Sequence, residues 1–130
     1  MKKILILLVL ILSGCTPKLY LDVFNNTRFD LFIGGIESVA IESGKNGRVK
    51  ILSSTRSIDL NTSEKSYEYS IRVSNIPGEF IVAGLVHKLK LQIQPTFEVY
   101  LLKPKCEFPV NDFSELEQPN GFPLVPASSL

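Results

Sequence analysis

The residue types that most often carry chemistry are scarce in this 130-residue chain, which has one histidine and two cysteines. His87 is the only histidine base for a Ser-His-Asp arrangement, and no Gly-x-Ser-x-Gly nucleophile motif accompanies it. A zinc site would draw on His87, Cys106 and scattered carboxylates, which lack the spacing of metal ligands. The loop at 44–47 lacks the Gly-Lys-Ser/Thr ending of a phosphate-binding loop. The sequence therefore predicts a protein that is not an enzyme and holds no metal or cofactor, with His87 at a strand end.

Cys15 stands at the end of a short apolar segment. Two lysines at the start of the chain precede an unbroken apolar run at 4–12, and two small residues come directly before the cysteine. A membrane-spanning helix needs about 20 apolar residues, so this run is too short to be one. The charge, the length and the small-residue ending are typical of a secretory signal peptide over residues 1–14.

The stretch Leu12-Ser13-Gly14-Cys15 resembles the lipobox of bacterial lipoproteins. The resemblance covers residues 1–16 and implies that the Cys15 thiol carries diacylglycerol, that the chain is cut before it, and that its new amino group is acylated. Thr16 after the cysteine implies sorting to the outer membrane, facing the periplasm, whereas a Gram-positive source would imply the cell membrane. Acyl chains of this kind anchor a small domain stably. Cys106 would then be the one free thiol of the mature chain.

Very little chain separates Cys15 from the first alternating segment. Residues 16–18 are the whole tether, and three extended residues reach about 10 Å. We therefore expect the domain that follows, residues 19–103, to lie close to the lipid headgroups.

Apolar and polar residues alternate along most of the segment 19–103, with turn residues at short intervals. This pattern predicts an all-β domain, either a small antiparallel β-sandwich or a barrel-like sheet, of about eight or nine short strands. The expected strands cover 20–24, 29–33, 39–41, 49–51, 58–60, 67–73, 80–86, 89–94 and 97–102. The polar cluster Asn25-Asn26-Thr27 predicts a hairpin turn between the first two.

Residues 104–130 have a different character. Five of the eight prolines lie here, no basic residue follows Lys105, and apolar side chains remain frequent. Asp112-Phe113-Ser114-Glu115 resembles a capping box and predicts one helical turn. Disordered tails are poorer in apolar residues, so we expect this irregular, acidic segment to pack on the domain or on a partner.

Two of the expected strands, 80–86 and 97–102, are apolar on both faces. Their outward side chains would leave an apolar patch unless something covers it. The candidate interaction face combines these side chains with one aromatic residue of the C-terminal segment: Ile81, Ala83, Leu85, Tyr100, Leu102 and Phe122. Either the chain's own C-terminal segment covers this face, or a partner protein of the cell envelope docks there.

The charge balance of 14 basic and 13 acidic residues does not favour a nucleic-acid partner. Three basic residues have two interpretations: Lys88, Lys90 and Arg72. They form a small basic strip that meets anionic headgroups or an acidic partner, or they belong to a solvated strand face. We predict a membrane-anchored accessory lipoprotein, acting as a structural or protein-interaction module. Its build is similar to that of outer-membrane lipoproteins of secretion machines, including type VI secretion. The alternative is a small binding or inhibitory module for a ligand, a glycan or a foreign enzyme such as lysozyme.

Overall fold

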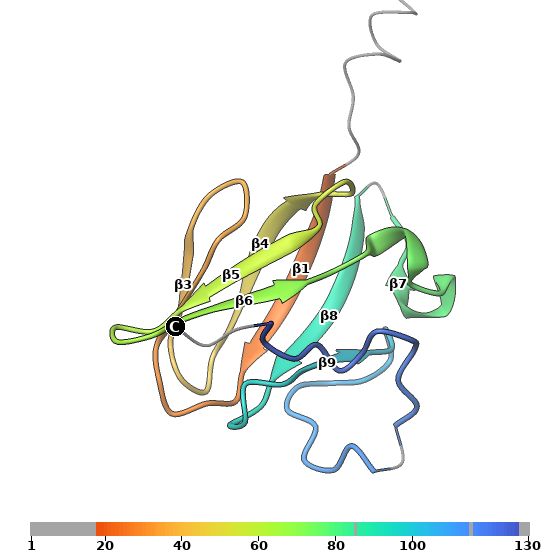
Figure 1. Ribbon diagram of the computed structural model, residues 1–130. Coiled ribbons are helices and arrows are strands. Elements are labelled where there is room, and N and C mark those ends of the chain that lie inside the picture. Colours follow the sequence, from red (N-terminus) through yellow and green to blue (C-terminus); the bar gives the residue numbers. More distant parts are fainter. Residues whose placement is uncertain (1–17, 85, 115, 128–130) are drawn as a thin grey trace, which may run out of the picture.

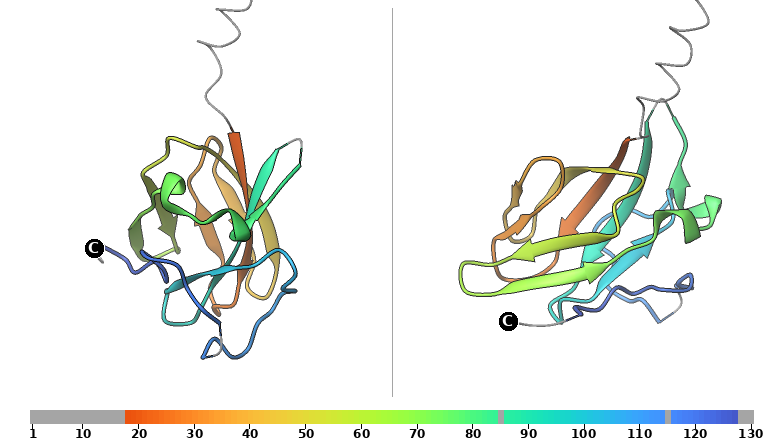
Figure 2. Two further views of the ribbon diagram at one scale, coloured as in Figure 1. Left: turned by 90° about the vertical axis from the view of Figure 1, so that its right-hand side faces the viewer. Right: turned by 45° about the horizontal axis from the view of Figure 1, so that its top comes forward.

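Two facing β-sheets make up the protein in a computed structural model that describes residues 18–84, 86–114 and 116–127 (Figures 1 and 2). The predicted signal peptide and Cys15 lie outside the described residues. The described part contains nine short strands and no α-helix, which confirms the predicted all-β, sandwich-like fold.

The larger sheet has five strands. Its path is β4 (Asn46–Leu52), β1 (Lys18–Asn25), β8 (His87–Ile93) and β7 (Ile81–Val82), and β9 (Val99–Leu102) also pairs with β8. Strand β7 pairs with the first half of β8, and β9 pairs with its second half. The pairing of β1 with β8 is parallel, whereas the other pairs are antiparallel. The sheet is therefore mixed, unlike the purely antiparallel sheet that the sequence suggested.

The smaller sheet has the order β3 (Val39–Ile41), β2 (Leu31–Ile33), β5 (Ser57–Asn61) and β6 (Ser66–Ser70), with all pairs antiparallel. Its alternation follows the sequence pattern, because side chains of successive strand residues point to opposite faces. Ile58 and Leu60 are buried, while Asp59 between them is exposed. One face of this sheet therefore packs on the core and the other meets solvent.

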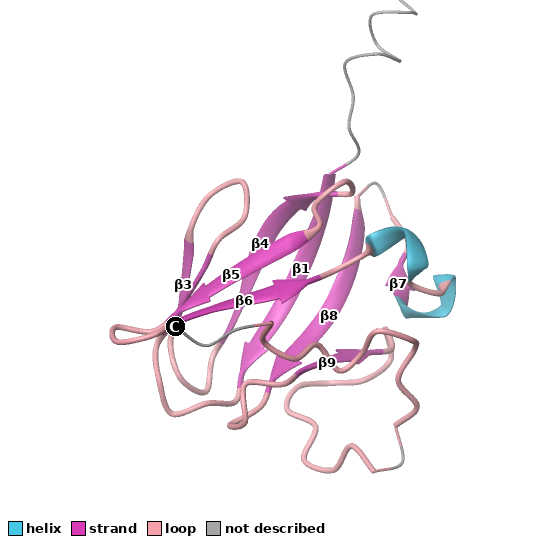
Figure 3. Ribbon diagram, in the orientation of Figure 1, coloured by secondary structure: helices cyan, strands magenta, loops and turns pink. Residues whose placement is uncertain are grey.

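Two short 3-10 turns, η1 (Val73–Asn75) and η2 (Gly78–Phe80), connect the sheets beside β7 (Figure 3). The predicted strand at 80–86 is therefore mostly wrong, since Phe80 belongs to η2 and only Ile81 and Val82 pair as a strand. The Pro77-Gly78 turn is followed directly by this 3-10 turn, which uses residues that an apolar run alone would assign to a strand.

The predicted hairpin at Asn25-Asn26-Thr27 is also wrong. Strand β1 pairs with β4 and β8, so the chain crosses here from the larger sheet to the smaller one. The Asn25 side chain is fully buried and donates to the carbonyls of Phe29 and Ile41 at 2.7 and 3.0 Å. The Thr27 hydroxyl donates to the Asn25 side-chain oxygen at 2.7 Å. These bonds satisfy buried polar groups where the two sheets are joined.

The core between the sheets is almost entirely aliphatic, with Tyr69 and Phe80 as its buried aromatic residues. Tyr69 is 1% exposed, and its hydroxyl donates to the carbonyl of Phe97 at 2.7 Å. Burial of the phenol, with a smaller contribution from the neighbouring Tyr67, raises the pKa of Tyr69 above its usual range. This tyrosine therefore stays neutral and keeps its hydrogen bond at all ordinary pH values.

Candidate functional site

The residues predicted as one interaction face are distributed over several environments. Ile81 pairs with the buried Leu89 and packs against the core, so it faces inward. Phe122 also packs against the core, while Ala83 is exposed beyond the end of β7. Leu85 lies outside the described residues. The structure therefore does not gather these residues into one exposed surface.

Tyr100 and Leu102 do point to the outer face of the larger sheet, but neither side chain is exposed. The ring of Tyr100 stacks on Phe113 with centroids 4.2 Å apart. Leu102 is only 1% exposed, although it lies outside the central core. This part of the predicted face is accordingly occupied by the chain itself.

Three contacts attach the first half of the C-terminal segment to this outer face. The Lys90 ammonium donates to the carbonyls of Pro104 and Cys106 at 3.1 and 2.8 Å. Phe108 stacks on Phe24 at 5.6 Å. The side chain of Gln92, which is 0% exposed, donates to the Val110 carbonyl and accepts from the Val110 amide, both at 2.8 Å. Gln92 thus pairs with the segment as a neighbouring strand would.

The second half of the segment returns along the edge of β9 (Figure 1). Gln118 uses the same arrangement as Gln92, with its side-chain amide paired to both the amide and the carbonyl of Leu101 at 2.9 and 2.8 Å. Leu124 forms a β-bridge with Val99 and is buried in the core. The Ala127 amide then donates to the Glu68 carbonyl of β6 at 2.8 Å. The segment therefore links the edges of the two sheets.

No helix is found among the described residues of the predicted helical turn at 112–115. The Ser114 amide donates to the Asp112 carboxylate at 2.9 Å, two residues away and not three as in a capping box. The hydrogen bonds from Ser114 lower the pKa of Asp112. Glu115, which the capping box would need, lies outside the described residues.

His87 and Cys106 are not combined in a reactive arrangement. His87 is exposed as the first residue of β8, as the sequence predicts for a strand-end residue. Cys106 is a half-buried free thiol in the C-terminal segment. No cluster of three potential metal ligands occurs among residues 18–84, 86–114 and 116–127.

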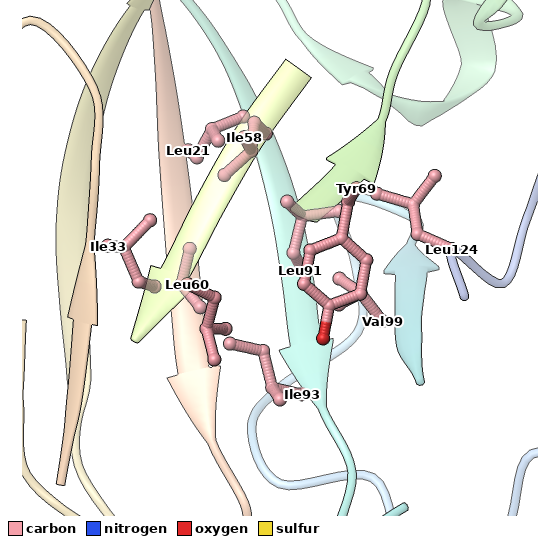
Figure 4. Close-up of a pocket in the computed structure, with 10 residues that line it drawn as sticks. Leu21, Ile33, Ile58, Leu60, Tyr69, Leu91, Ile93, Val99 and Leu124 are labelled. Atoms are coloured by element: carbon pink, nitrogen blue, oxygen red, sulfur yellow. The ribbon is translucent and has the colours of Figure 1, made fainter. Parts of the chain in front are cut away.

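A small apolar cavity of about 20 Å³ lies between the sheets (Figure 4). Leu21 and Leu91 from the larger sheet, Leu60 and Tyr69 from the smaller sheet and Leu124 from the C-terminal segment are among its walls. An apolar space that is barely large enough for one water molecule stays empty and holds no ligand. It is a packing defect of the core.

A surface hollow of about 350 Å³ lies at the end of the sandwich where β1 finishes. It is lined by Arg28, Phe29, Asp30, Phe32 and Ser63. Phe29 and Phe32 are each 45% exposed, which is unusual for aromatic side chains. Phe29 lies against Phe97 at 6.1 Å, and Phe97 in turn stacks on Tyr67 at 4.5 Å, so the exposed ring is supported from behind. We name the residues lining this hollow the far-end surface.

A second hollow, of about 170 Å³, lies at the opposite end, where β1 begins. Its walls are polar apart from Val73: Ser53, Ser54, Thr55, Arg56, Arg72 and Ser74. Both arginines are exposed, and neither takes part in a salt bridge with another described residue. We name this hollow the arginine cleft. Arg72, which the sequence grouped with Lys88 and Lys90, belongs here with Arg56.

A third hollow, a groove of about 370 Å³, separates β6 and η1 from the C-terminal segment. Arg72 and Asn75 lie on one side of it, and Asn120 and Phe122 lie on the other. Its floor includes the buried residues Ile71 and Leu124. The groove combines an apolar floor with polar walls, which suits a small polar ligand.

Within the described residues, no helix has both the length and the apolar character to cross a membrane. Comparison of the chain with protein-family models, with curated proteins and with solved structures finds no match.

Sequence reasoning overlooked both the far-end surface and the arginine cleft. A signal for the first was present, because Phe32 interrupts the alternation of Leu31 and Ile33 with an apolar outward residue. The cleft had no local signal, since Arg56 and Arg72 are 16 positions apart in the sequence. They meet because β5 and β6 are neighbours and the Ile71 amide donates to the Arg56 carbonyl at 2.9 Å.

Proposed function

We propose that this chain is a membrane-anchored accessory lipoprotein whose β-sandwich is a protein-interaction module of the bacterial cell envelope. The anchor is argued from the lipobox-like stretch at 12–15 and from the short tether at 16–18. The interaction role is supported by one observation above all: the pair of exposed phenylalanines on the far-end surface.

The far-end surface has the composition of a docking site. Aromatic side chains dominate binding energy at protein interfaces, and polar residues at the rim give orientation. Here Phe29 and Phe32 supply the apolar centre, and Arg28 and Asp30 supply charges of both signs beside it. The partner that fits is a protein with one or two projecting apolar side chains and a mixed-charge border.

The position of this surface agrees with the proposed anchor. Strand β1 begins at Lys18, three residues after Cys15, and runs toward Asn25, after which the chain reaches Phe29 (Figure 1). The far-end surface therefore lies at the opposite end of β1 from the proposed lipid. A protein held at the bilayer by residue 15 would present these aromatic rings away from the membrane.

Photocrosslinking in the producing cell tests the interaction. A photoreactive amino acid at Phe32 is expected to capture one reproducible partner, whereas the same amino acid at Ser66, on the polar outer face of β6, is expected to capture none. Phe29→Ala is expected to weaken binding of the captured partner about tenfold or more. Equal adduct patterns at both positions would contradict the proposal.

The anchor is tested separately by the mass of the purified intact protein. Cleavage before Cys15 and attachment of acyl chains predict a defined mass, and Cys15→Ser is expected to abolish both changes. An unmodified mature chain would contradict the lipoprotein assignment whatever the crosslinking shows.

The alternative, a binding or inhibitory module for a ligand or glycan, has one specific observation in its favour. The groove between Arg72 and Phe122 offers hydrogen-bonding side chains above an apolar floor. Binding of an oligosaccharide that is lost on Asn75→Ala together with Asn120→Ala, with no partner captured at Phe32, would favour this alternative.

A further inference from the structure

The arginine cleft carries two positive charges that are not compensated by the described residues around it. Its walls contain Arg56, Arg72 and several hydroxyl groups, and none of the residues that line it is acidic. Each guanidinium group can form paired hydrogen bonds with a phosphate oxygen pair. The chemistry of this cleft is therefore that of an anion site, with phosphate as the best match in geometry and charge.

The cleft lies at the end of the sandwich from which the chain leads to Cys15. Lys18, the first residue of β1, pairs directly with Leu52, the last residue of β4. The loop 53–56 that forms one wall of the cleft follows at once. Because three residues span at most about 10 Å, a lipid on Cys15 would hold this loop near the headgroup layer.

Further basic residues lie at the same end, on the outer face of the larger sheet. Tyr20 pairs with Lys50 on one side and Lys88 on the other, and the Lys50 ammonium lies 5.6 Å from the centre of the Tyr20 ring. The C-terminal segment, whose charged residues after Lys105 are all acidic, lies around the other end of β8 and β9 (Figure 2). Lys50 and Lys88 therefore lie at the same end of β1 as the arginine cleft.

We propose that the arginine cleft binds the phosphate of an anionic lipid headgroup in the membrane that carries the anchor. This inference rests on the proposed lipid anchor, and it assigns to the domain a second, non-covalent membrane contact. Arg56 and Arg72 hold the phosphate, and the hydroxyls of Ser53, Ser54 and Ser74 are the additional donors. The second contact fixes the orientation of the sandwich, since a single point of attachment does not define the rotation of a domain about it.

Hydrogen exchange of the backbone amides at 53–56 and 72–74 tests this contact in the complete mature protein. The protein is inserted through its anchor into vesicles of phosphatidylcholine alone, or of phosphatidylcholine with one third phosphatidylglycerol. Slower exchange of these amides is expected only with phosphatidylglycerol, and 0.5 M salt is expected to abolish the difference because surface attraction is screened. Equal exchange in both kinds of vesicle would overturn the proposal.

Substitution of the two arginines locates the site. The measured quantity is the ratio of headgroup-bound to unbound protein, obtained from the protection of the cleft amides. Arg56→Gln or Arg72→Gln is expected to lower this ratio about fivefold, and the double variant about thirtyfold. Lys45→Gln is the control, because Lys45 is exposed beside Asn25 at the other end of β1, and it is expected to leave the protection of the cleft amides unchanged. Exchange of the amides in β1 and β8 reports in the same experiment whether each variant is folded. Protection that survives the double variant would overturn the assignment to this cleft.

Two further measurements are needed. One distinguishes a lipid phosphate from free phosphate, and the other distinguishes failure of this inference from failure of the proposed anchor. Inorganic phosphate added to the protein in neutral vesicles is expected to protect these amides weakly or not at all. Full protection by free phosphate would overturn the membrane assignment. The intact mass is measured on the same sample: an acylated protein without headgroup protection refutes this inference alone, whereas an unacylated protein refutes the proposed anchor.

Discussion

The outer faces of the two sheets differ in what covers them. On the larger sheet Gln92 points away from the core, yet it is 0% exposed because the C-terminal segment packs over it and pairs with its amide. On the smaller sheet Asp59 and Glu68, which face each other across β5 and β6, remain exposed. The difference follows the outward side chains. The segment packs where Tyr100 offers an apolar ring and where the Gln92 amide and the Lys90 ammonium offer hydrogen bonds, and it does not cover the paired carboxylates of Asp59 and Glu68.

The C-terminal segment is therefore a structural part of the sandwich. It contributes Leu124 to the core and joins the edges of β9 and β6 through Val99 and Glu68. Side chains of β1 and β8 attach the first half of the segment. Phe24 of β1 stacks on Phe108, and the Lys90 ammonium of β8 donates to the carbonyls of Pro104 and Cys106.

The largest effect is expected from truncation of the segment before Pro104. The truncated chain loses the buried Leu124 and the Phe108 ring that stacks on Phe24. Loss of one buried leucine alone costs about 2–5 kcal/mol, which is a large share of the stability of a small domain. Chemical denaturation of the truncated chain is expected to show either a strongly reduced free energy of unfolding or no cooperative transition. A transition like that of the full chain would show that the cover is dispensable.

Gln92→Leu removes the paired hydrogen bonds that attach the segment at Val110, without changing the size of the side chain much. The Val110 amide and carbonyl lose their partner at once, at a cost of about 1–3 kcal/mol. Faster hydrogen exchange at Val110, with β1 and β4 unchanged, is the expected signature. Gln118→Leu, at the more exposed attachment to Leu101, is the matched variant and is expected to cost less.

Tyr69→Phe is expected to cost about 1 kcal/mol, because the carbonyl of Phe97 loses its hydrogen bond. The variant also changes the pH dependence. The folded state holds the Tyr69 proton more tightly than the unfolded state, whose tyrosine pKa is about 10. The stability contribution is thus complete below pH 10 and is lost as the pH rises further.

Urea unfolding of the wild-type chain and of Tyr69→Phe between pH 8 and pH 11 measures this difference. The loss of stability above about pH 10 is expected to be smaller in the variant, because it has no phenol to ionise at this position. Parallel curves for the two proteins would contradict the assignment.

Asp59→Ala is expected to have the smallest effect, within about 0.5 kcal/mol, because an exposed carboxylate on an open sheet face makes little net contribution. Thermal unfolding measures it. A loss comparable to that of Gln92→Leu would mean that the outer face of the smaller sheet is also covered in solution, and the contrast between the two faces would fail.

The prediction of strands from the sequence was most successful where one face of the strand is buried and the other is exposed to solvent. Strand β5 is an example, because Ile58 and Leu60 alternate with polar residues and each side chain meets the environment that its type favours. The prediction failed at 80–86, where every residue is apolar and periodicity has no information about backbone conformation. The turn at Pro77-Gly78 and the following η2 decide that segment.

The candidate site illustrates the same limit. The sequence indicated that apolar residues near β7 and β9 need a cover, and it offered the C-terminal segment or a partner protein as that cover. It could not decide between the two, nor indicate that Ile81 faces inward. The far-end surface depends on a non-hairpin crossing after Asn25, and the arginine cleft depends on the pairing of β5 with β6.

The sequence by itself determined the all-β class and most of the strands, because alternation and turn residues act over a few neighbouring positions. It also contains the lipobox-like stretch on which the proposed anchor rests. Only the tertiary structure decided that β1 pairs in parallel with β8, that Gln92 and Gln118 hold the C-terminal segment, and that Arg56 meets Arg72. These contacts join residues far apart in the chain, and their formation depends on how the two sheets close around a shared core.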